Sequence, residues 1–162
     1  MLLKKLGLDK DTFALRWFGV MKVPMILFTM PWIKEVNDQR CEVVIPLGMR
    51  TRNHLKSMYF GALCTGADVS GGFLAMRLAW KTKQPVNLIF KSFKAEFLKR
   101  AEGDVHFVCE AGGRIVEHFE QCVRTGERVT FPVEVIAYVP SKLGQEPVAR
   151  FELGLSLKKK GT

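Results

Sequence analysis

The segment YFGALCTGADVSGGFLAMRLAW, residues 59–80, is the most informative part of the chain about its fold. Apolar residues occur on almost every side of a helix drawn through it, which is typical of a helix that is buried all round. Ser57 precedes it as a favourable N-cap residue. Each interior glycine costs a helix roughly 1 kcal/mol relative to alanine, so the glycines of this segment indicate the close approach of another backbone. We therefore predict a long central helix that packs tightly against a sheet.

The residues on either side of this helix have the pattern of β-strands. Residues 86–98 and 104–110 are separated by a short turn-like segment, and together they predict a long hairpin. Further strands are predicted at residues 41–47, 131–139 and 149–157. The segment between the last two, residues 140–147, is expected to be a loop.

Two shorter amphipathic helices complete the set of elements. One is predicted over residues 11–21, stopped by Pro24, and the other over residues 114–124, opened by Gly112 and Gly113. A buried helix followed by a meander of antiparallel strands predicts an α+β domain in which the sheet wraps around the helix, the hotdog fold. The shorter helices are then an N-terminal addition and an insertion between strands. Since no repeat or low-complexity linker interrupts the chain, we predict a single domain over residues 1–162.

Composition limits the classes of protein to which the chain can belong. The longest apolar stretch, residues 23–33, contains two prolines and is shorter than the ~20 residues that cross a bilayer, so no membrane span is expected. The N-terminus has no apolar run ending in a small-residue cleavage site, which predicts a cytoplasmic protein. No C-x-x-C pair occurs, and the three histidines complete no compact four-ligand set with the cysteines, so no metal site is predicted. The cysteines are Cys41, Cys64, Cys109 and Cys122.

The formal net charge of +9 raises the question of an anionic partner. The basic residues fall into separate groups near residues 50–56, 91–100 and 158–160. No helix-turn-helix, zinc-finger or RNA-binding motif accompanies them, so no nucleic-acid partner is predicted. Solvated surface charge and the binding of an anionic ligand such as coenzyme A both remain open.

Two segments resemble the hotdog-fold acyl-CoA thioesterases, in the branch similar to phenylacetyl-CoA thioesterases. Residues 52–63, RNHLKSMYFGAL, are similar to the start of the central helix in that family, where an asparagine precedes a glycine-containing turn and an acidic residue follows within the helix. Asn53 matches the asparagine, Gly61 the second glycine, and Asp68 the acid. Residues 93–104, FKAEFLKRAEGD, resemble the family's strand end with its aromatic-Leu-x-x-Ala-x-x-Gly-Asp pattern.

The resemblance implies hydrolysis of an acyl-CoA or a related acyl thioester, with coenzyme A as part of the substrate and no separate cofactor. The backbone amides of Phe60 and Gly61, at a helix N-terminus, would hold the developing oxyanion. Asp68 would activate water or attack the thioester directly, and Asn53 would orient the water. In the resembling enzymes these groups meet between subunits, so we expect a homodimer or a dimer of dimers, with Asn53 of one subunit beside Asp68 of its partner.

One departure from the family pattern keeps other functions open. Tyr59-Phe60-Gly61 stands where the family often has His-Gly-Gly, so the histidine role is lost or passes to the Tyr59 hydroxyl, and Phe60 could block the entrance. A non-catalytic acyl-CoA or acyl-ligand binding protein is therefore the alternative. A dehydratase of the same fold would need a histidine near the helix start, where only His54 is available. Structural roles also stay open for Asp68 as a buried acid, for Asn53 in the turn and for Tyr59 in packing.

Overall fold

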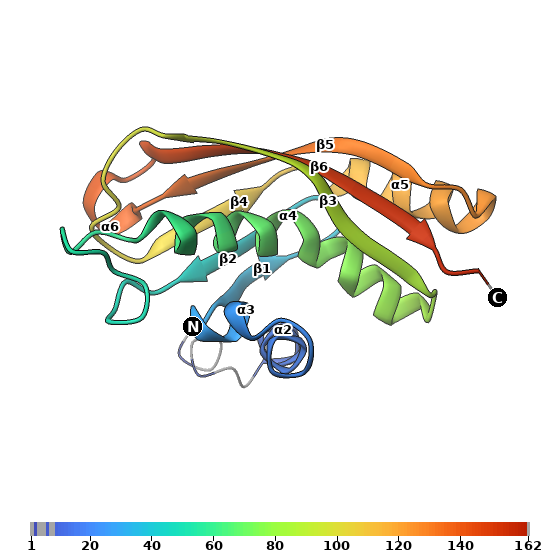
Figure 1. The fold of residues 1–162 in the computed structure, drawn as a ribbon, viewed down its shortest axis with the longest axis horizontal. Helices are drawn as coiled ribbons and strands as arrows, with labels where there is room; N and C mark the ends of the chain where they lie inside the picture. The colour runs from blue at the N-terminus through green and yellow to red at the C-terminus, as the bar shows by residue number, and fades with distance from the viewer. Residues whose placement is uncertain (1, 3–5, 7–8, 162) are drawn as a thin grey trace.

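A six-stranded antiparallel sheet wraps around one long helix in the computed structural model, which describes residues 2, 6 and 9–161 (Figure 1). The strand order is β1-β2-β4-β5-β6-β3. The strands are β1 Trp32–Val36, β2 Cys41–Ile45, β3 Val86–Phe97, β4 Val105–Cys109, β5 Val129–Tyr138 and β6 Pro147–Lys159. The helices are α2 Lys10–Met21, α3 Pro24–Phe28, α4 Phe60–Thr82, α5 Gly112–Thr125 and α6 Pro140–Leu143. This arrangement confirms the predicted hotdog fold.

The glycines of α4 allow the helix to lie close to the sheet. A Cβ atom on Gly66 would come within 2.3 Å of the buried Phe107 ring on β4. A Cβ on Gly71 would instead meet Val133 of β5 at 3.4 Å. The predicted close approach is therefore confirmed most sharply at Gly66, where no larger residue fits without moving the sheet.

The start of α4 differs from the prediction in one respect. Its N-cap is Tyr59, which makes no side-chain capping hydrogen bond, so the prediction of Ser57 as N-cap is wrong. The Ser57 hydroxyl lies 3.3 Å from Asn53 Oδ1 and is used within the preceding loop. Met58 and Tyr59 lie between Ser57 and the first residue of α4. The backbone N–H of Met58 donates to Ala101 O, which joins the loop before α4 to the connection between β3 and β4.

The predicted hairpin of β3 and β4 is wrong. β3 pairs with β6 at the sheet edge, while β4 pairs with β2 and β5. Backbone hydrogen bonds to other segments hold the connection between β3 and β4. Leu98 N donates to Val148 O on β6, and Ala101 O accepts from Met58 N in the loop before α4. Turn-like composition therefore located the connection without identifying the strand partners.

Three short elements were not predicted. α3 lies in the apolar segment with two prolines, where Pro24 begins α3 rather than only ending the helix before it, and β1 starts at the end of that segment. β1 turns into β2 through Asn37, whose Oδ1 accepts the backbone N–H groups of Gln39 and Arg40. The third element, α6, occupies the first part of the predicted loop. All three elements have five residues or fewer, which is too short for a periodic pattern to emerge.

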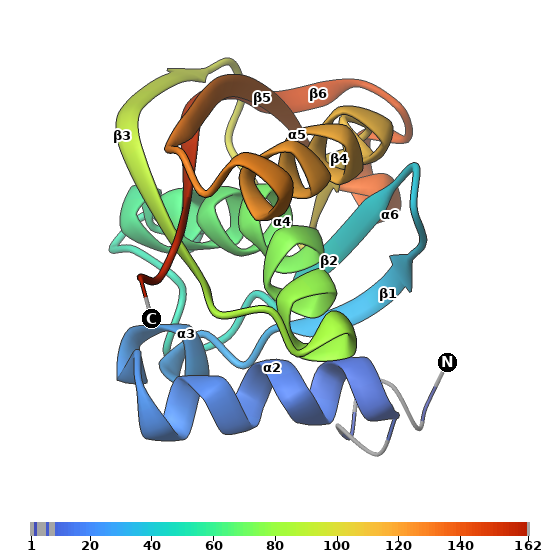
Figure 2. The ribbon, with the colours of Figure 1, turned by 90° about the vertical axis from the view of Figure 1, so that its right-hand side faces the viewer.

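The N-terminal helices α2 and α3 cover one flank of α4, as Figure 2 shows. Asp9 caps α2 by accepting from Thr12 N at 3.1 Å, and the buried Thr12 hydroxyl accepts from Ile33 N at 2.9 Å. Asp11 pairs with Arg77 of α4 at 2.9 Å. Within residues 2, 6 and 9–161, no helix is both long and apolar enough to cross a membrane.

Candidate active site

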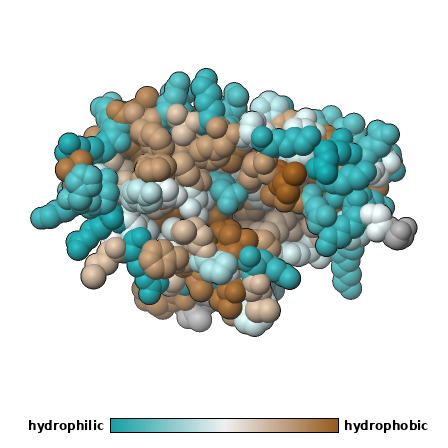
Figure 3. All heavy atoms as spheres, in the orientation of Figure 1, coloured by the Kyte–Doolittle hydropathy of each residue, from teal (hydrophilic) through white to brown (hydrophobic). Residues whose placement is uncertain are grey.

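Asp68 lies in the middle of α4 and lines a cavity of about 630 Å³. The cavity lies between α4, the two N-terminal helices and β3. Figure 3 shows apolar side chains gathered over this region of the surface. The residues that share the cavity wall with Asp68 include the apolar Phe18, Ile26, Met76, Leu88 and Phe90 and the polar Gln84, Asn87 and Lys160. The carboxylate is thus a polar group on a mainly apolar wall.

The surroundings of Asp68 disfavour its charged form. Burial raises the pKa of Asp68 from 3.8 to about 6. Among the residues that the structure describes, none donates a hydrogen bond to this carboxylate and no cation pairs with it. An acid in such surroundings titrates close to neutral pH and can exchange protons with a bound substrate or water.

The start of α4 presents two backbone amides that the rest of the described chain does not use. Ala62 N and Leu63 N both donate to Tyr59 O, and Tyr59 N donates to Thr51 O at 2.7 Å. Phe60 N and Gly61 N have no acceptor among the described residues. These amides add to the partial positive charge of the helix N-terminus, so they can stabilise an oxyanion.

Tyr59 and Phe60 form an exposed aromatic pair at this helix start. Their ring centroids are 4.8 Å apart, and the Phe60 ring, which is 57% exposed, also meets Phe97 at 6.3 Å. A Cβ on Gly61 would lie 2.5 Å from the Tyr59 ring, so Gly61 makes room for Tyr59. Tyr59 therefore packs against its own helix with its side chain half exposed.

Asn53 shapes the loop before α4. Its Oδ1 accepts from Leu55 N at 2.9 Å and from Ser57 N at 3.2 Å, and Lys56 within this loop has a positive φ of 61°. No group in the described part of the chain accepts from Asn53 Nδ2. The carbonyl end of Asn53 thus serves the turn, while its N–H groups remain available.

One chain does not bring all the predicted site residues together. Asp68 lies seven positions after Gly61 in the helix, which corresponds to roughly 10 Å along the axis. The free amides of Phe60 and Gly61 therefore lie too far from the Asp68 carboxylate of the same chain to act on one substrate carbonyl. His54 is exposed in the loop before α4 and takes no part in this arrangement.

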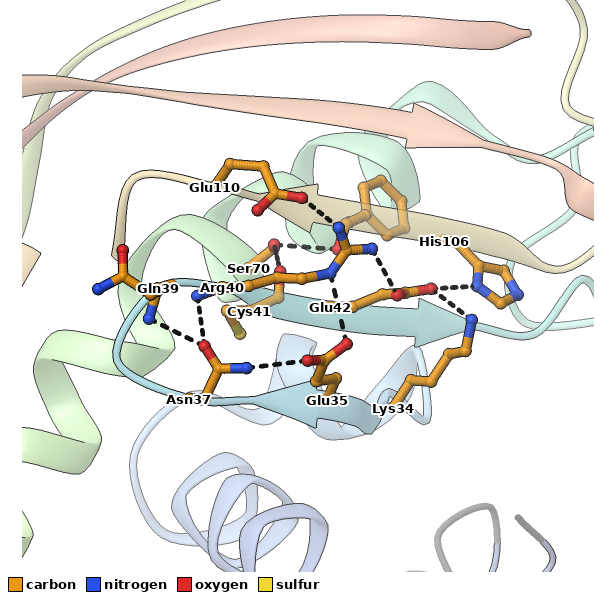
Figure 4. Close-up of polar contacts among 11 residues, drawn as sticks. Lys34, Glu35, Asn37, Gln39, Arg40, Cys41, Glu42, Ser70, His106 and Glu110 are labelled. Atoms are coloured by element: carbon orange, nitrogen blue, oxygen red, sulfur yellow. Dashed lines mark hydrogen bonds and ion pairs between the residues drawn. The ribbon is translucent and has the colours of Figure 1, made fainter. Parts of the chain in front are cut away.

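A second polar cluster, on the outer face of the sheet, was not predicted (Figure 4). Glu42 of β2 accepts from Lys34 Nζ at 2.9 Å and from Arg40 Nη2 at 2.8 Å, and its Oε1 lies 2.7 Å from His106 Nδ1. Burial alone would raise the pKa of Glu42, but the hydrogen bonds from His106, Arg40 and Lys34 hold that pKa well below its usual range. Arg40 also pairs with Glu110. Glu42 and His106 are diagonal neighbours on the paired strands β2 and β4, where Glu42 lies opposite Val108 and His106 opposite Val44. Their contact depends on a strand pairing that the sequence alone did not identify.

The described residues contain no group of three or more His, Cys, Asp or Glu side chains that could hold a metal ion. The four cysteines are free. Burial raises the pKa values of the Cys41 and Cys109 thiols, which keeps them in the neutral form.

The fold and this site define a hotdog-fold protein with an acidic residue in its central helix. Residues 12–153 match the family model described as a domain of unknown function, DUF4442, and the chain belongs to that family. A comparison with curated protein sequences finds no match.

Solved structures of similar fold cover almost the whole chain. A protein of unknown function from Chlorobaculum tepidum TLS gives a TM-score of 0.78 at 15% identity, covering 96% of this chain and 99% of that one. A protein from Shewanella oneidensis, proposed to be a thioesterase, gives 0.75 at 14% identity, covering 94% and 99%. A thioesterase from Haemophilus influenzae gives 0.63 at 12% identity, covering 83% and 82%. At these identities the likeness establishes the hotdog fold.

Proposed function

We propose that the protein hydrolyses an acyl thioester, with an acyl-CoA as the substrate, to the free acid and the thiol. The observation that carries this proposal is the Asp68 carboxylate, which has no described partner and lies on the wall of an apolar cavity. Because its pKa is raised to about 6, Asp68 is both ionised and appreciably basic at neutral pH. Thioesterase names among proteins of the same fold support the same chemistry.

In this proposal Asp68 removes a proton from a water molecule, whose oxygen adds to the thioester carbonyl carbon. The carbonyl oxygen becomes an oxyanion and accepts hydrogen bonds from the amides of Phe60 and Gly61. Collapse of the tetrahedral intermediate breaks the carbon–sulfur bond, and the proton held by Asp68 passes to the departing thiolate. Attack by Asp68 itself, followed by hydrolysis of an anhydride, is the other route open to this carboxylate.

The helix start and Asp68 would come from different subunits. The separation of roughly 10 Å within one chain argues for this division. The edge strand β3 supports pairing with a second copy, since it is long and open and exposes Ile89, Phe93 and Phe97. Asn53 of one subunit would then point its free Nδ2 toward water or substrate beside Asp68 of its partner, and the exposed Tyr59 hydroxyl could donate there as well.

The first experiment measures thiol release from a panel of short, medium, long and aromatic acyl-CoAs. Wild type should turn over at least one class, and Asp68→Asn should lower kcat/KM about 10³-fold or more, as expected when a proton acceptor is lost. Asp38→Asn is the matched control, because Asp38 is exposed and lies outside the site. Size-exclusion profiles of all three proteins should coincide.

A non-catalytic acyl-CoA binding protein is the second candidate. The observation that favours it is the exposed Phe60 ring at the helix start, where the resembling enzymes often have glycine. Binding of acyl-CoA without thiol release by wild type would select this function and exclude hydrolysis.

Subunit complementation tests the shared site directly. Asn53→Ala and Asp68→Asn each place a defect in both sites of a homodimer, whereas a mixed dimer has one doubly defective site and one intact site. Co-refolded mixtures should therefore recover about a quarter of the wild-type activity per chain. Recovery no greater than the sum of the two variants would show that both residues act within one subunit.

A further inference from the structure

The outward face of the two N-terminal helices carries large apolar side chains. α2 buries Thr12, Leu15 and Gly19 against the rest of the molecule. The other side of α2 and the adjoining α3 expose Phe13, Trp17, Val20, Met21, Met25 and Phe28, here called the α2–α3 face. These helices form the lower edge of the molecule in Figure 2, with α4 above them. Contiguous exposed apolar patches of this kind mark interaction sites.

Two aromatic rings dominate the α2–α3 face. Phe13 is 61% exposed and Trp17 is 57% exposed. Their rings are stacked with centroids 6.4 Å apart and planes within 10° of each other. Tryptophan and phenylalanine are the side chains that enter the boundary between lipid headgroups and acyl chains most readily.

Basic side chains surround this apolar face. Lys10 and Lys22 are exposed at the two ends of α2, and Arg50 lies over the Phe28 ring at 5.9 Å, which joins the loop before α4 to the face. That loop, residues 48–57, adds Arg52 and Lys56 and contains no acidic residue. The acids of residues 9–28 are Asp9, which caps α2 by accepting from Thr12 N, and Asp11, whose charge is paired with Arg77.

We propose that the α2–α3 face binds the surface of an anionic phospholipid membrane. The apolar side chains would lie at the headgroup–acyl boundary, and the surrounding lysines and arginines would pair with lipid phosphates. Charge favours this occupant over a second copy of the chain, because a two-fold contact through this face would bring like-charged borders together. Phe18 and Ile26 of the same two helices line the Asp68 cavity, so the cavity and the membrane-binding face share a wall.

The test is co-sedimentation with vesicles, which does not depend on any thioesterase activity. Wild type should bind vesicles of phosphatidylcholine and phosphatidylglycerol in about a two-to-one ratio, bind pure phosphatidylcholine far more weakly, and dissociate as salt is raised. Trp17→Ser should lower the partition coefficient about tenfold. Lys22→Glu should lower it more than Lys142→Glu, an identical charge change on the exposed α6.

Thermal melts of the three variants should match that of wild type, since all three positions are exposed. The proposal fails if wild type binds neither kind of vesicle, or if Trp17→Ser and Lys22→Glu bind as wild type does. It also fails if Trp17→Ser converts a larger assembly into a smaller one in size exclusion, which would assign the face to a second copy of the chain.

Discussion

Asp68 and Glu42 are both carboxylates that are at least partly shielded from water, but their surroundings shift their pKa values in opposite directions. Asp68 lies on the inner helix beside an apolar cavity, without a described partner, and its pKa is raised to about 6. Glu42 lies on the outer face of the sheet, and its side chain is 6% exposed. Three cationic or hydrogen-bonding side chains hold the pKa of Glu42 below its usual range.

This difference determines which carboxylate is available for chemistry. An ionised acid that is neutralised by Lys34, Arg40 and His106 is a poor base, because taking up a proton would leave these partners without their anion. An acid without partners pays the cost of burial and keeps its basicity. Glu42 therefore stabilises the sheet, while Asp68 costs stability and is proposed to act on substrate.

The largest effect on stability is expected from Glu42→Gln. The substitution leaves Lys34, Arg40 and His106 around a neutral amide, and breaking a buried pair costs 3–5 kcal/mol when the partners are fully buried. Lys34 and Arg40 keep 43% and 32% of their side-chain surface exposed, so water compensates part of the loss. We expect the free energy of unfolding in urea to fall by about 3 kcal/mol.

Glu134→Gln is the matched control for this variant. Glu134 is 64% exposed in its side chain and lies 4.0 Å from Arg150, so its substitution should change the free energy of unfolding by less than about 0.5 kcal/mol. Equal effects of the two substitutions would show that the cluster around Glu42 contributes nothing beyond ordinary surface charge.

The inner side of the sheet depends on close contact rather than on charge, which Gly66→Ala tests. The added methyl would meet the Phe107 ring at 2.3 Å, and Phe107 is fully buried and cannot move aside. We expect the free energy of unfolding in urea to fall by about 2 kcal/mol, since the cost of overpacking exceeds the gain in helix propensity. Gly71→Ala, whose added methyl has its nearest neighbour at 3.4 Å, should leave the free energy of unfolding unchanged or raise it in the same urea experiment.

These two sides of the sheet also differ in how well sequence predicted them. The central helix, and its need for small residues, followed from composition and periodicity within one continuous segment. The Glu42–His106 contact joins residues 64 positions apart and depends on β2 lying beside β4. The predicted hairpin paired β4 with β3 and gave no indication that β2 is its neighbour, because local turn signals do not specify strand order.

The predicted site residues divide in the same way. Asp68 was identified within one short segment, from its match to the acid of the resembling thioesterases and from the cost of burying a carboxylate among apolar neighbours. The structure places it on a cavity wall. The Ser57 cap was wrong because Ser57 is held by Asn53. That bond depends on the loop between β2 and α4, whose course is set by contacts with residues far along the chain.

Asp68→Asn should stabilise the protein while it abolishes turnover. The folded state raises the pKa of Asp68 above its value in the unfolded chain. The contribution of Asp68 to the free energy of unfolding therefore falls as the pH rises from about 4 to about 6, and it stays low at higher pH. A neutral asparagine removes this penalty, and we expect a gain of about 1 kcal/mol in the free energy of unfolding at pH 7. At pH 4 the variant and wild type should be equally stable. A variant that is less stable than wild type at pH 7 would indicate that Asp68 makes a favourable ionic contact.

The smallest expected effect is that of Glu42→Gln on the pH dependence of catalysis. With Asp68 as the base, kcat/KM of wild type should fall tenfold per pH unit below about pH 6, because the protonated acid cannot accept a proton from water. Glu42 lies on the other face of the sheet, so the pH–rate profile of Glu42→Gln should keep the same inflection within about 0.3 unit. The measurement is made at a temperature where the variant remains fully folded. A displaced inflection would mean that the outer cluster is electrostatically coupled to Asp68, and the division between a structural and a reactive carboxylate would then no longer hold.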